Sequence, residues 1–107
     1  MRVLFDQCTP VPLRSRLPRH DVETAYERGW KSLTNGELLD AAEAAGFDLL
    51  VTTDQGLRYQ QNLAKRRIRT LVLKTTSWPK IKKHAEMVAR AIDELAPGEY
   101  REISFPS

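Results

Sequence analysis

Residues 46–54 read Gly46-Phe47-Asp48-Leu49-Leu50-Val51-Thr52-Thr53-Asp54. Four of the five residues from Phe47 to Val51 are apolar, a pattern that predicts a short strand covered on both faces of a parallel sheet. Two threonines and Asp54 follow, so this carboxylate is expected at the carboxyl end of the strand, where the next helix begins. Ligands of open parallel α/β sheets bind along that edge. The segment therefore predicts both a central strand and a site beside it.

The first residues of the chain repeat this pattern. The run Arg2-Val3-Leu4-Phe5-Asp6 is a second apolar segment that ends in an aspartate. If the two segments form neighbouring strands, Asp6 and Asp54 meet at one edge of the sheet although they lie far apart in the sequence. A buried strand gains no stability from an unpaired terminal carboxylate, so a functional role for Asp6 is favoured.

The rest of the sequence alternates between strand and helix patterns. Strands are predicted over residues 20–25, 68–73 and 100–105, the first and last of them at the edges of the sheet. Helices are predicted over residues 34–45, 55–65 and 77–95. Such alternation is typical of a mainly parallel sheet with helices on both faces. A chain of 107 residues forms a single domain, residues 1–107.

Composition excludes several protein classes. The single cysteine, Cys8, excludes an intrachain disulfide, favours a reducing compartment and is interpreted as a small buried thiol. No apolar run approaches the length of a membrane span, and the early charged residues argue against a signal peptide. We therefore expect a soluble cytoplasmic protein without a membrane partner.

Basic residues outnumber acidic ones, and the formal net charge is +3. A charge of this size favours an anionic partner but is also compatible with many ordinary proteins. The cations fall into three groups: Arg14, Arg16 and Arg19; Lys65, Arg66, Arg67 and Arg69; and Lys80, Lys82 and Lys83. Each group alone is explained by solvated helix ends, whereas three groups around an acidic site favour contact with nucleic acid.

The candidate catalytic and metal-binding residues are Asp6, Glu37 and Asp54. Three carboxylates about 5 Å apart repel one another by roughly 3 kcal/mol per pair, so such a cluster requires a cation. Oxygen ligands with room for water suit Mg²⁺ or Mn²⁺, which can orient a water molecule and neutralise a phosphate. Two structural alternatives remain open, because Glu37 can complete a capping box with Thr34 and Asp54 can cap the following helix.

Three motifs occur in order along the chain: Leu4-Phe5-Asp6-Gln7-Cys8-Thr9-Pro10, Glu37-Leu38-Leu39-Asp40-Ala41-Ala42 and Leu50-Val51-Thr52-Thr53-Asp54. Together they resemble the short bacterial PIN-like proteins of the PIN-domain nuclease superfamily, which includes toxins of toxin–antitoxin pairs. The resemblance implies a three-layer α/β/α sandwich with a central, mainly parallel sheet of about five strands. It also implies an Mg²⁺- or Mn²⁺-dependent ribonuclease site at Asp6, Glu37 and Asp54.

The chain departs from the family pattern at three places. Gln7-Cys8 follows the first aspartate where relatives often have Glu-Asn. Asn35 stands where many relatives place an aspartate, and Gly56 stands where a further acid is often found. A site with fewer acids is expected to bind a metal ion more weakly.

The first hypothesis for function is a metal-dependent endoribonuclease, the toxin component of a toxin–antitoxin pair. In it, Asp6, Glu37 and Asp54 hold the ion, while Asn35 and Thr53 orient ligands or water. The RNA backbone is bound by exposed cations, namely Arg58, Lys65, Arg66 and Arg67. The expected partners are an RNA substrate, a small antitoxin protein and a second copy of the chain in a homodimer.

Two other hypotheses remain open. A catalytically silent PIN-like module that binds a protein or RNA partner is suggested by Asn35 and Gly56 in place of acids. A receiver-like or nucleotide-binding α/β domain shares the sheet. That third hypothesis ranks last, because the sequence has neither a phosphate-binding glycine loop nor a well-placed lysine after a later strand.

Overall fold

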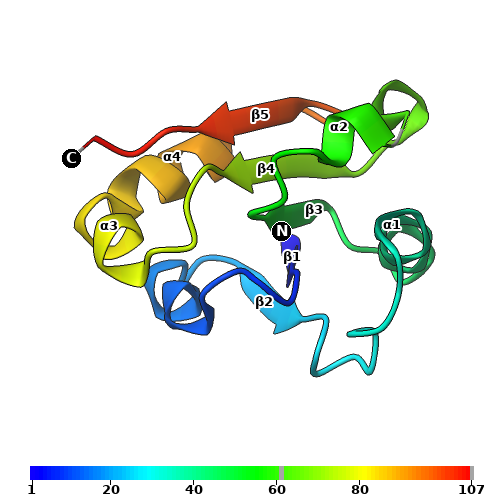
Figure 1. The fold of residues 1–107 in the computed structure, drawn as a ribbon, viewed down its shortest axis with the longest axis horizontal. Helices are drawn as coiled ribbons and strands as arrows, with labels where there is room; N and C mark the ends of the chain where they lie inside the picture. Colours follow the sequence, from blue (N-terminus) through cyan, green and yellow to red (C-terminus); the bar gives the residue numbers. More distant parts are fainter. Residues whose placement is uncertain (61, 107) are drawn as a thin grey trace.

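The central sheet of the computed structural model has five strands, all of them parallel (Figure 1). The structure describes residues 1–60 and 62–106. The strands are β1 (Arg2–Phe5), β2 (Asp21–Thr24), β3 (Leu49–Thr52), β4 (Arg69–Leu73) and β5 (Tyr100–Ile103). They lie in the order β2-β1-β3-β4-β5, so the apolar strands β1 and β3 are neighbours and the more polar β2 and β5 form the edges. The predicted α/β class, parallel sheet and edge strands are confirmed.

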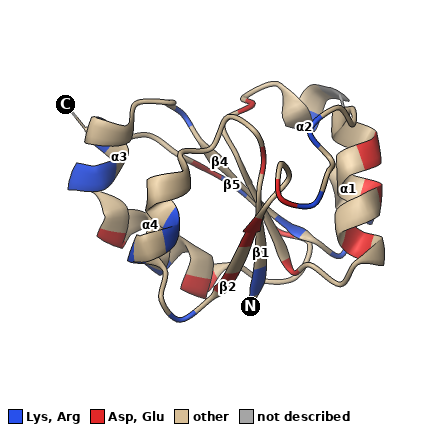
Figure 2. Cartoon of the chain, turned by 90° about the horizontal axis from the view of Figure 1, so that it is seen from below, with Lys and Arg blue, Asp and Glu red and all other residues tan. Residues whose placement is uncertain are grey.

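Helices cover both faces of the sheet and produce three layers (Figure 2). One face carries α1 (Asn35–Ala44) and the short α2 (Leu57–Gln60); the other carries the 3₁₀ helix η1 (Val11–Arg16), α3 (Trp78–Lys83) and α4 (Ala85–Glu94). Successive side chains of a strand point to opposite faces. Val3 and Phe5 therefore join the core beneath η1, α3 and α4, while Leu4 joins the core beneath α1 and α2. In the described part of the chain, no helix is both long enough and apolar enough to cross a membrane.

Helix α1 begins where the sequence predicts. The Glu37 N–H donates to the Thr34 hydroxyl, and the Thr34 N–H donates to the Glu37 carboxylate, which is the predicted capping box. The apolar face of α1 is buried against the sheet. Gly46 follows the helix with a φ of +82°, a left-handed conformation that favours glycine, and the chain then turns into β3.

Two predicted helices differ from the observed ones. The helix predicted over residues 77–95 is divided into α3 and α4, because the His84 backbone (φ −121°, ψ 27°) lies outside the helical range. The helix predicted over residues 55–65 is replaced by α2 and a 3₁₀ turn, Leu63–Lys65. The Asp54 carboxylate accepts from the Gly56 N–H in a local turn, which delays the helix until Leu57. Gln61, also within the predicted helix, lies outside the described residues.

The pairing of β1 with β3 sets the position of the candidate site. Phe5 lies beside Val51 in the register, so Asp6 comes next to Thr52 where the two strands end. The Asp6 N–H donates to the Val51 carbonyl oxygen at 3.1 Å, which extends the pairing by one residue. Since β2 and β3 lie on opposite sides of β1, the connections diverge at this point. Sheets with this strand order bind ligands at such a switch point.

Candidate functional site

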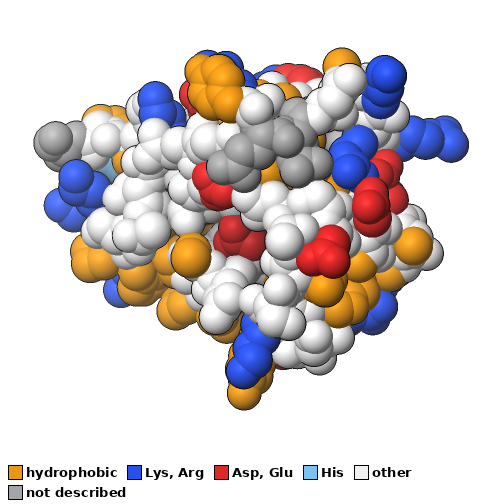
Figure 3. All heavy atoms as spheres, turned by 45° about the vertical axis from the view of Figure 1, so that its right-hand side comes forward, with side chains coloured by type: hydrophobic (Ala, Val, Ile, Leu, Met, Phe, Trp, Pro, Cys, Tyr) orange, Lys and Arg blue, Asp and Glu red, His pale blue; other side chains and the backbone are white. Residues whose placement is uncertain are grey.

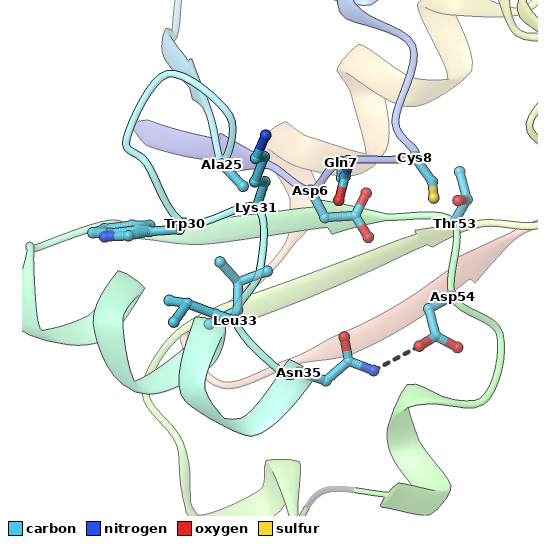
Figure 4. A pocket seen from close by; sticks show the side chains of 11 residues that line it. Asp6, Gln7, Cys8, Ala25, Trp30, Lys31, Leu33, Asn35, Thr53 and Asp54 are labelled. Carbon is cyan, nitrogen blue, oxygen red and sulfur yellow. Dashed lines mark hydrogen bonds between the residues drawn. The ribbon is translucent and has the colours of Figure 1, made fainter.

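A cavity of about 400 Å³ opens beside the carboxyl ends of β1 and β3 (Figure 4). Its polar lining comes from the turn after β1, the loop after β3 and the residues that lead into α1: Asp6, Gln7, Cys8, Lys31, Asn35, Thr53 and Asp54. Its apolar wall consists of Ala25, Trp30, Leu33 and Leu38. Figure 3 shows acidic side chains set back in a hollow on one face of the molecule. Four predicted site residues therefore lie around one cavity: Asp6, Asn35, Thr53 and Asp54.

Three neutral donors hold the Asp6 carboxylate. Its Oδ1 accepts from the backbone N–H and from the hydroxyl of Thr9, at 3.1 and 2.7 Å. Its Oδ2 accepts from the hydroxyl of Thr52. Within residues 1–60 and 62–106, Asp6 forms no ion pair. The contacts therefore fix the direction of the carboxylate and leave its charge uncompensated.

Asp54 is held in a similar way on another side of the cavity. Its Oδ2 accepts from the side-chain amide of Asn35 at 2.7 Å, and its Oδ1 accepts from the Gly56 N–H at 2.9 Å. The first contact joins the start of α1 to the loop after β3 (Figure 4). The second contact is a local turn just before α2. Asp54 thus orders its own loop with one oxygen and meets α1 with the other.

Thr52 connects the two aspartates, although the sequence predicts that Thr53 is the supporting residue. The Thr52 hydroxyl donates to Asp6 and accepts from the Asp54 N–H at 3.0 Å. Thr52 is only 1% exposed, whereas Thr53 lines the cavity itself. A buried hydroxyl requires a hydrogen-bond partner. A threonine at the end of an otherwise apolar strand is the sequence signal that could have identified this role.

The structure does not place the third predicted carboxylate, Glu37, at the cavity of Asp6 and Asp54. Glu37 is exposed and does not line the cavity, and its carboxylate accepts from the Thr34 N–H at 2.9 Å. This hydrogen bond lowers the pKa of Glu37 below its ordinary value. Across the described ranges, no three or more histidine, cysteine, aspartate or glutamate side chains are grouped so as to hold a metal ion. The physical reason is local: the backbone donor one helical turn away holds the Glu37 carboxylate.

Four further cavity residues were not assigned a role from the sequence: Gln7, Cys8, Trp30 and Lys31. The sequence predicts a buried Cys8 thiol, but Cys8 is exposed because the chain leaves the sheet directly after Asp6. Trp30 packs edge-on against Phe47, with ring centroids 6.1 Å apart. This contact anchors the loop that carries Lys31 to the edge of the cavity.

The four cations predicted to bind RNA have different surroundings. Arg66 forms ion pairs with Asp40 at 2.9 Å and with Glu43 at 2.6 Å. These pairs tie the segment before β4 to α1, so the Arg66 charge is already compensated within the fold. The other three side chains are exposed: Lys65 and Arg67, which form no ion pair in the described residues, and Arg58, which pairs with Glu102 at 3.9 Å.

A second hollow, of about 260 Å³, gathers positive charge between η1 and the junction of α3 with α4. Its charged side chains are Arg16, Lys82, Lys83, Glu86 and Arg90. Four cations against one carboxylate leave a net charge of +3, as large as the formal net charge of the whole chain. In the part of the chain that the structure describes, none of these four cations forms an ion pair. Two of the three basic groups noted in the sequence therefore meet here.

The cavity beside Asp6 and Asp54 combines two carboxylates with amide and hydroxyl oxygens. Comparison of the chain with family models, curated proteins and solved structures gives no match. The chemistry of the cavity is therefore the guide to function. Hard oxygen donors suit Mg²⁺ and Mn²⁺, and Mg²⁺ is commonly bound by one or two carboxylates together with water and substrate phosphate. Two carboxylates are thus enough for a site of this kind.

Proposed function

We propose that this protein is a PIN-like endoribonuclease that depends on Mg²⁺ or Mn²⁺. The observation that carries this function is the position of Asp6 and Asp54 on one cavity at the switch point of a parallel sheet. Neither carboxylate forms an ion pair with a cation in the described residues. Like charges that share a cavity repel each other. A divalent cation removes this repulsion, which favours metal binding here.

The donor set fits such an ion. Asp6 and Asp54 hold it through carboxylate oxygens, and it supplies charge neutralisation at the phosphate and activation of the attacking water. Thr9 and Thr52 keep the Asp6 carboxylate in one orientation. Asn35 does the same for Asp54. These side chains hold both carboxylates in position before the substrate binds. The carboxylates therefore need little reorganisation during hydrolysis.

The distribution of positive charge supports a polyanionic substrate. Lys31 lines the cavity that contains Asp6 and Asp54. The second hollow holds four cations that form no ion pair in the described residues, Arg16, Lys82, Lys83 and Arg90, together with one carboxylate, Glu86. Contacts from lysine and arginine to phosphates supply much of the affinity of nucleic-acid-binding proteins. We assign Arg58, Lys65 and Arg67 to the same task. Arg58 has one long ion pair, with Glu102 at 3.9 Å, and is exposed, whereas Arg66 is excluded because it is mostly buried and pairs with both Asp40 and Glu43.

Cleavage of a labelled RNA in Mn²⁺ and in EDTA tests this function. The wild-type protein is expected to produce fragments only in Mn²⁺, and Asp6→Asn is expected to reduce cleavage about a thousandfold. Asparagine keeps the size of the side chain and still accepts from Thr9, so the variant is expected to remain folded, which circular dichroism checks. Cleavage in EDTA, or full activity of folded Asp6→Asn, contradicts the mechanism.

A catalytically silent PIN-like module is the second candidate, and the finding of two carboxylates instead of three favours it. In this case Asn35 and Gly56 replace lost acids, and the protein binds RNA or a protein partner without hydrolysis. RNA binding that is insensitive to Mn²⁺ and never leads to fragments identifies this function.

The toxin role within the first candidate depends on the resemblance of the three sequence motifs to PIN-like proteins. Its partner is a small antitoxin protein. Co-expression with the product of the neighbouring gene tests this role, and a stable complex that suppresses RNA cleavage is the expected result. Growth inhibition by the protein alone, relieved by the neighbour, provides the matching readout in cells.

A further inference from the structure

Exposed apolar side chains border the acidic cavity. Among the described residues, the large apolar side chains left exposed are Val11, Tyr26 and Tyr59, at 52%, 69% and 77%. Val11 and Tyr26 line a hollow of about 340 Å³ that also includes Asp6 and Gln7. Asp6 and Gln7 line the 400 Å³ cavity as well. The two spaces therefore meet at a residue that we assign to metal binding.

A braced turn after β2 presents the Tyr26 ring. The Glu27 N–H donates to the Thr24 hydroxyl at 3.0 Å, and the Thr24 N–H donates to the Glu27 carboxylate at 2.9 Å. Arg14 forms an ion pair with the same carboxylate at 2.6 Å. The Tyr26 carbonyl oxygen accepts from the Gly29 N–H at 3.0 Å. The backbone around Tyr26 is thus held by four contacts while its ring stays in solvent.

Positive charge lies next to this ring. Lys31 Nζ is 5.7 Å from the centroid of the Tyr26 ring, and Lys31 also lines the cavity of Asp6 and Asp54. Arg14 lines the smaller hollow as well, but its charge is paired there with Glu27, so Lys31 supplies the positive charge beside the ring. An exposed aromatic ring with a lysine over it matches a nucleotide, which has a base that stacks and an anionic phosphate. Val11 and Tyr26 form too small an apolar area for a protein or lipid partner.

We propose that Tyr26 stacks on the base of the nucleotide next to the phosphodiester bound at Asp6. This assignment rests on the proposed ribonuclease function, because it places the reacting phosphodiester at Asp6. A base can stack on a protein side chain only when it is unpaired and turned out of a helix. The contact with Tyr26 therefore requires an unpaired nucleotide at this position, and a continuous duplex cannot form it.

Binding of a fluorescein-labelled RNA of about eight nucleotides, followed by anisotropy in EDTA, tests the stacking site. Tyr26→Ala is expected to weaken binding about tenfold, while Tyr26→Phe, which keeps the ring, stays within about twofold of the wild type. Tyr59 is similarly exposed and lines neither hollow, but it contacts Arg58. The matched control is therefore Tyr59→Ala in an Arg58→Ala background, which is expected to bind RNA as Arg58→Ala alone does. Wild-type affinity in folded Tyr26→Ala overturns the assignment. An equal loss in Tyr26→Phe overturns it too, because the ring would then not be the binding element.

Cleavage in Mn²⁺ separates failure of the stacking site from failure of the ribonuclease function. If the wild type cleaves RNA and Tyr26→Ala binds and cleaves equally well, the stacking site is wrong and the ribonuclease function stands. If binding depends on Tyr26 but no cleavage occurs, the ribonuclease function is wrong and the base site stands. Annealing the RNA to its complement is expected to remove the difference between wild type and Tyr26→Ala. A difference that persists on duplex RNA contradicts the requirement for an unpaired base.

Discussion

The carboxylate on the edge strand β2 and those at the carboxyl ends of β1 and β3 have different partners. On β2, Glu23 forms ion pairs with Arg2 at 3.0 Å and with Arg28 at 3.4 Å. After β1 and β3, Asp6 and Asp54 accept only from hydroxyl, amide and backbone groups in the described chain. The charge of Glu23 is therefore compensated within the fold. Asp6 and Asp54 are oriented but keep their charge, as a binding site for a cation requires.

The most direct test of this comparison removes one carboxylate charge from each region. Asp54→Asn is expected to lower Mn²⁺-dependent RNA cleavage about a thousandfold, because it removes a metal ligand worth several kcal/mol in the transition state. Glu23→Gln is the matched variant. It weakens two partly exposed ion pairs, costs about 1 kcal/mol of stability or less for each and leaves cleavage unchanged. Similar cleavage rates for the two folded variants would show that the two regions do not differ in function.

The neutral donor between the two aspartates gives the next largest effect. Thr52→Val removes the hydroxyl that contacts Asp6 and the Asp54 N–H. A supporting residue of this kind is expected to change activity about 10- to 100-fold. Thr52→Ser keeps the hydroxyl and is expected to restore most of the cleavage. If the serine variant is as impaired as the valine variant, the methyl packing of Thr52 matters and the hydrogen bonds do not.

Glu37 lies at the start of α1, and its substitution is expected to give the smallest effect on cleavage. Its carboxylate caps the helix through the Thr34 N–H, as the Glu23 carboxylate pairs with Arg2 within the fold. Glu37→Gln is expected to leave RNA cleavage within about twofold of the wild type, in contrast to a lost metal ligand. Its pKa is lowered by the hydrogen bond from Thr34, so the ionised form stabilises the folded state above its ordinary pKa of 4.5. That contribution is lost as the pH falls below 4.5.

Melting temperatures measured between pH 3 and pH 7 check this contribution of Glu37. The wild type is expected to lose more stability below pH 4.5 than Glu37→Gln, because the glutamine does not titrate. Identical pH profiles would remove the capping explanation. A large loss of cleavage in the variant would restore Glu37 to the metal site.

Much of the fold was predictable from local patterns. The apolar runs that end at Phe5 and Val51 predict central strands, and β1 and β3 are neighbours in the sheet. Because parallel strands end at the same edge, the approach of Asp6 to Asp54 follows from those runs. The break at His84 did not follow, since the apolar period continues across it. Hydrophobic periodicity records which face is buried and not whether the backbone is continuous.

Site residues could be predicted from the sequence only where a buried strand fixes the position of the side chain that follows it. Glu37 has the same sequence pattern as a capping residue and as a metal ligand, and the nearby Thr34 N–H decides between them. Thr52 and Thr53 are adjacent, so a shift of one residue in the end of the strand exchanges their roles. Arg66 pairs with Asp40 and Glu43, which are more than 20 residues away in the sequence. The local pattern of charges cannot predict these pairs.

Thermal stability in Mn²⁺ tests most directly whether the carboxyl end of the sheet is kept for a cation. The melting temperature of the wild-type protein is expected to rise by several degrees when Mn²⁺ reaches about ten times its dissociation constant, a stabilisation of about 1.4 kcal/mol. The variant with both Asp6→Asn and Asp54→Asn is expected to show no rise, and Glu23→Gln is expected to respond like the wild type. No response in the wild type, or an equal response in the double variant, would contradict metal binding by Asp6 and Asp54.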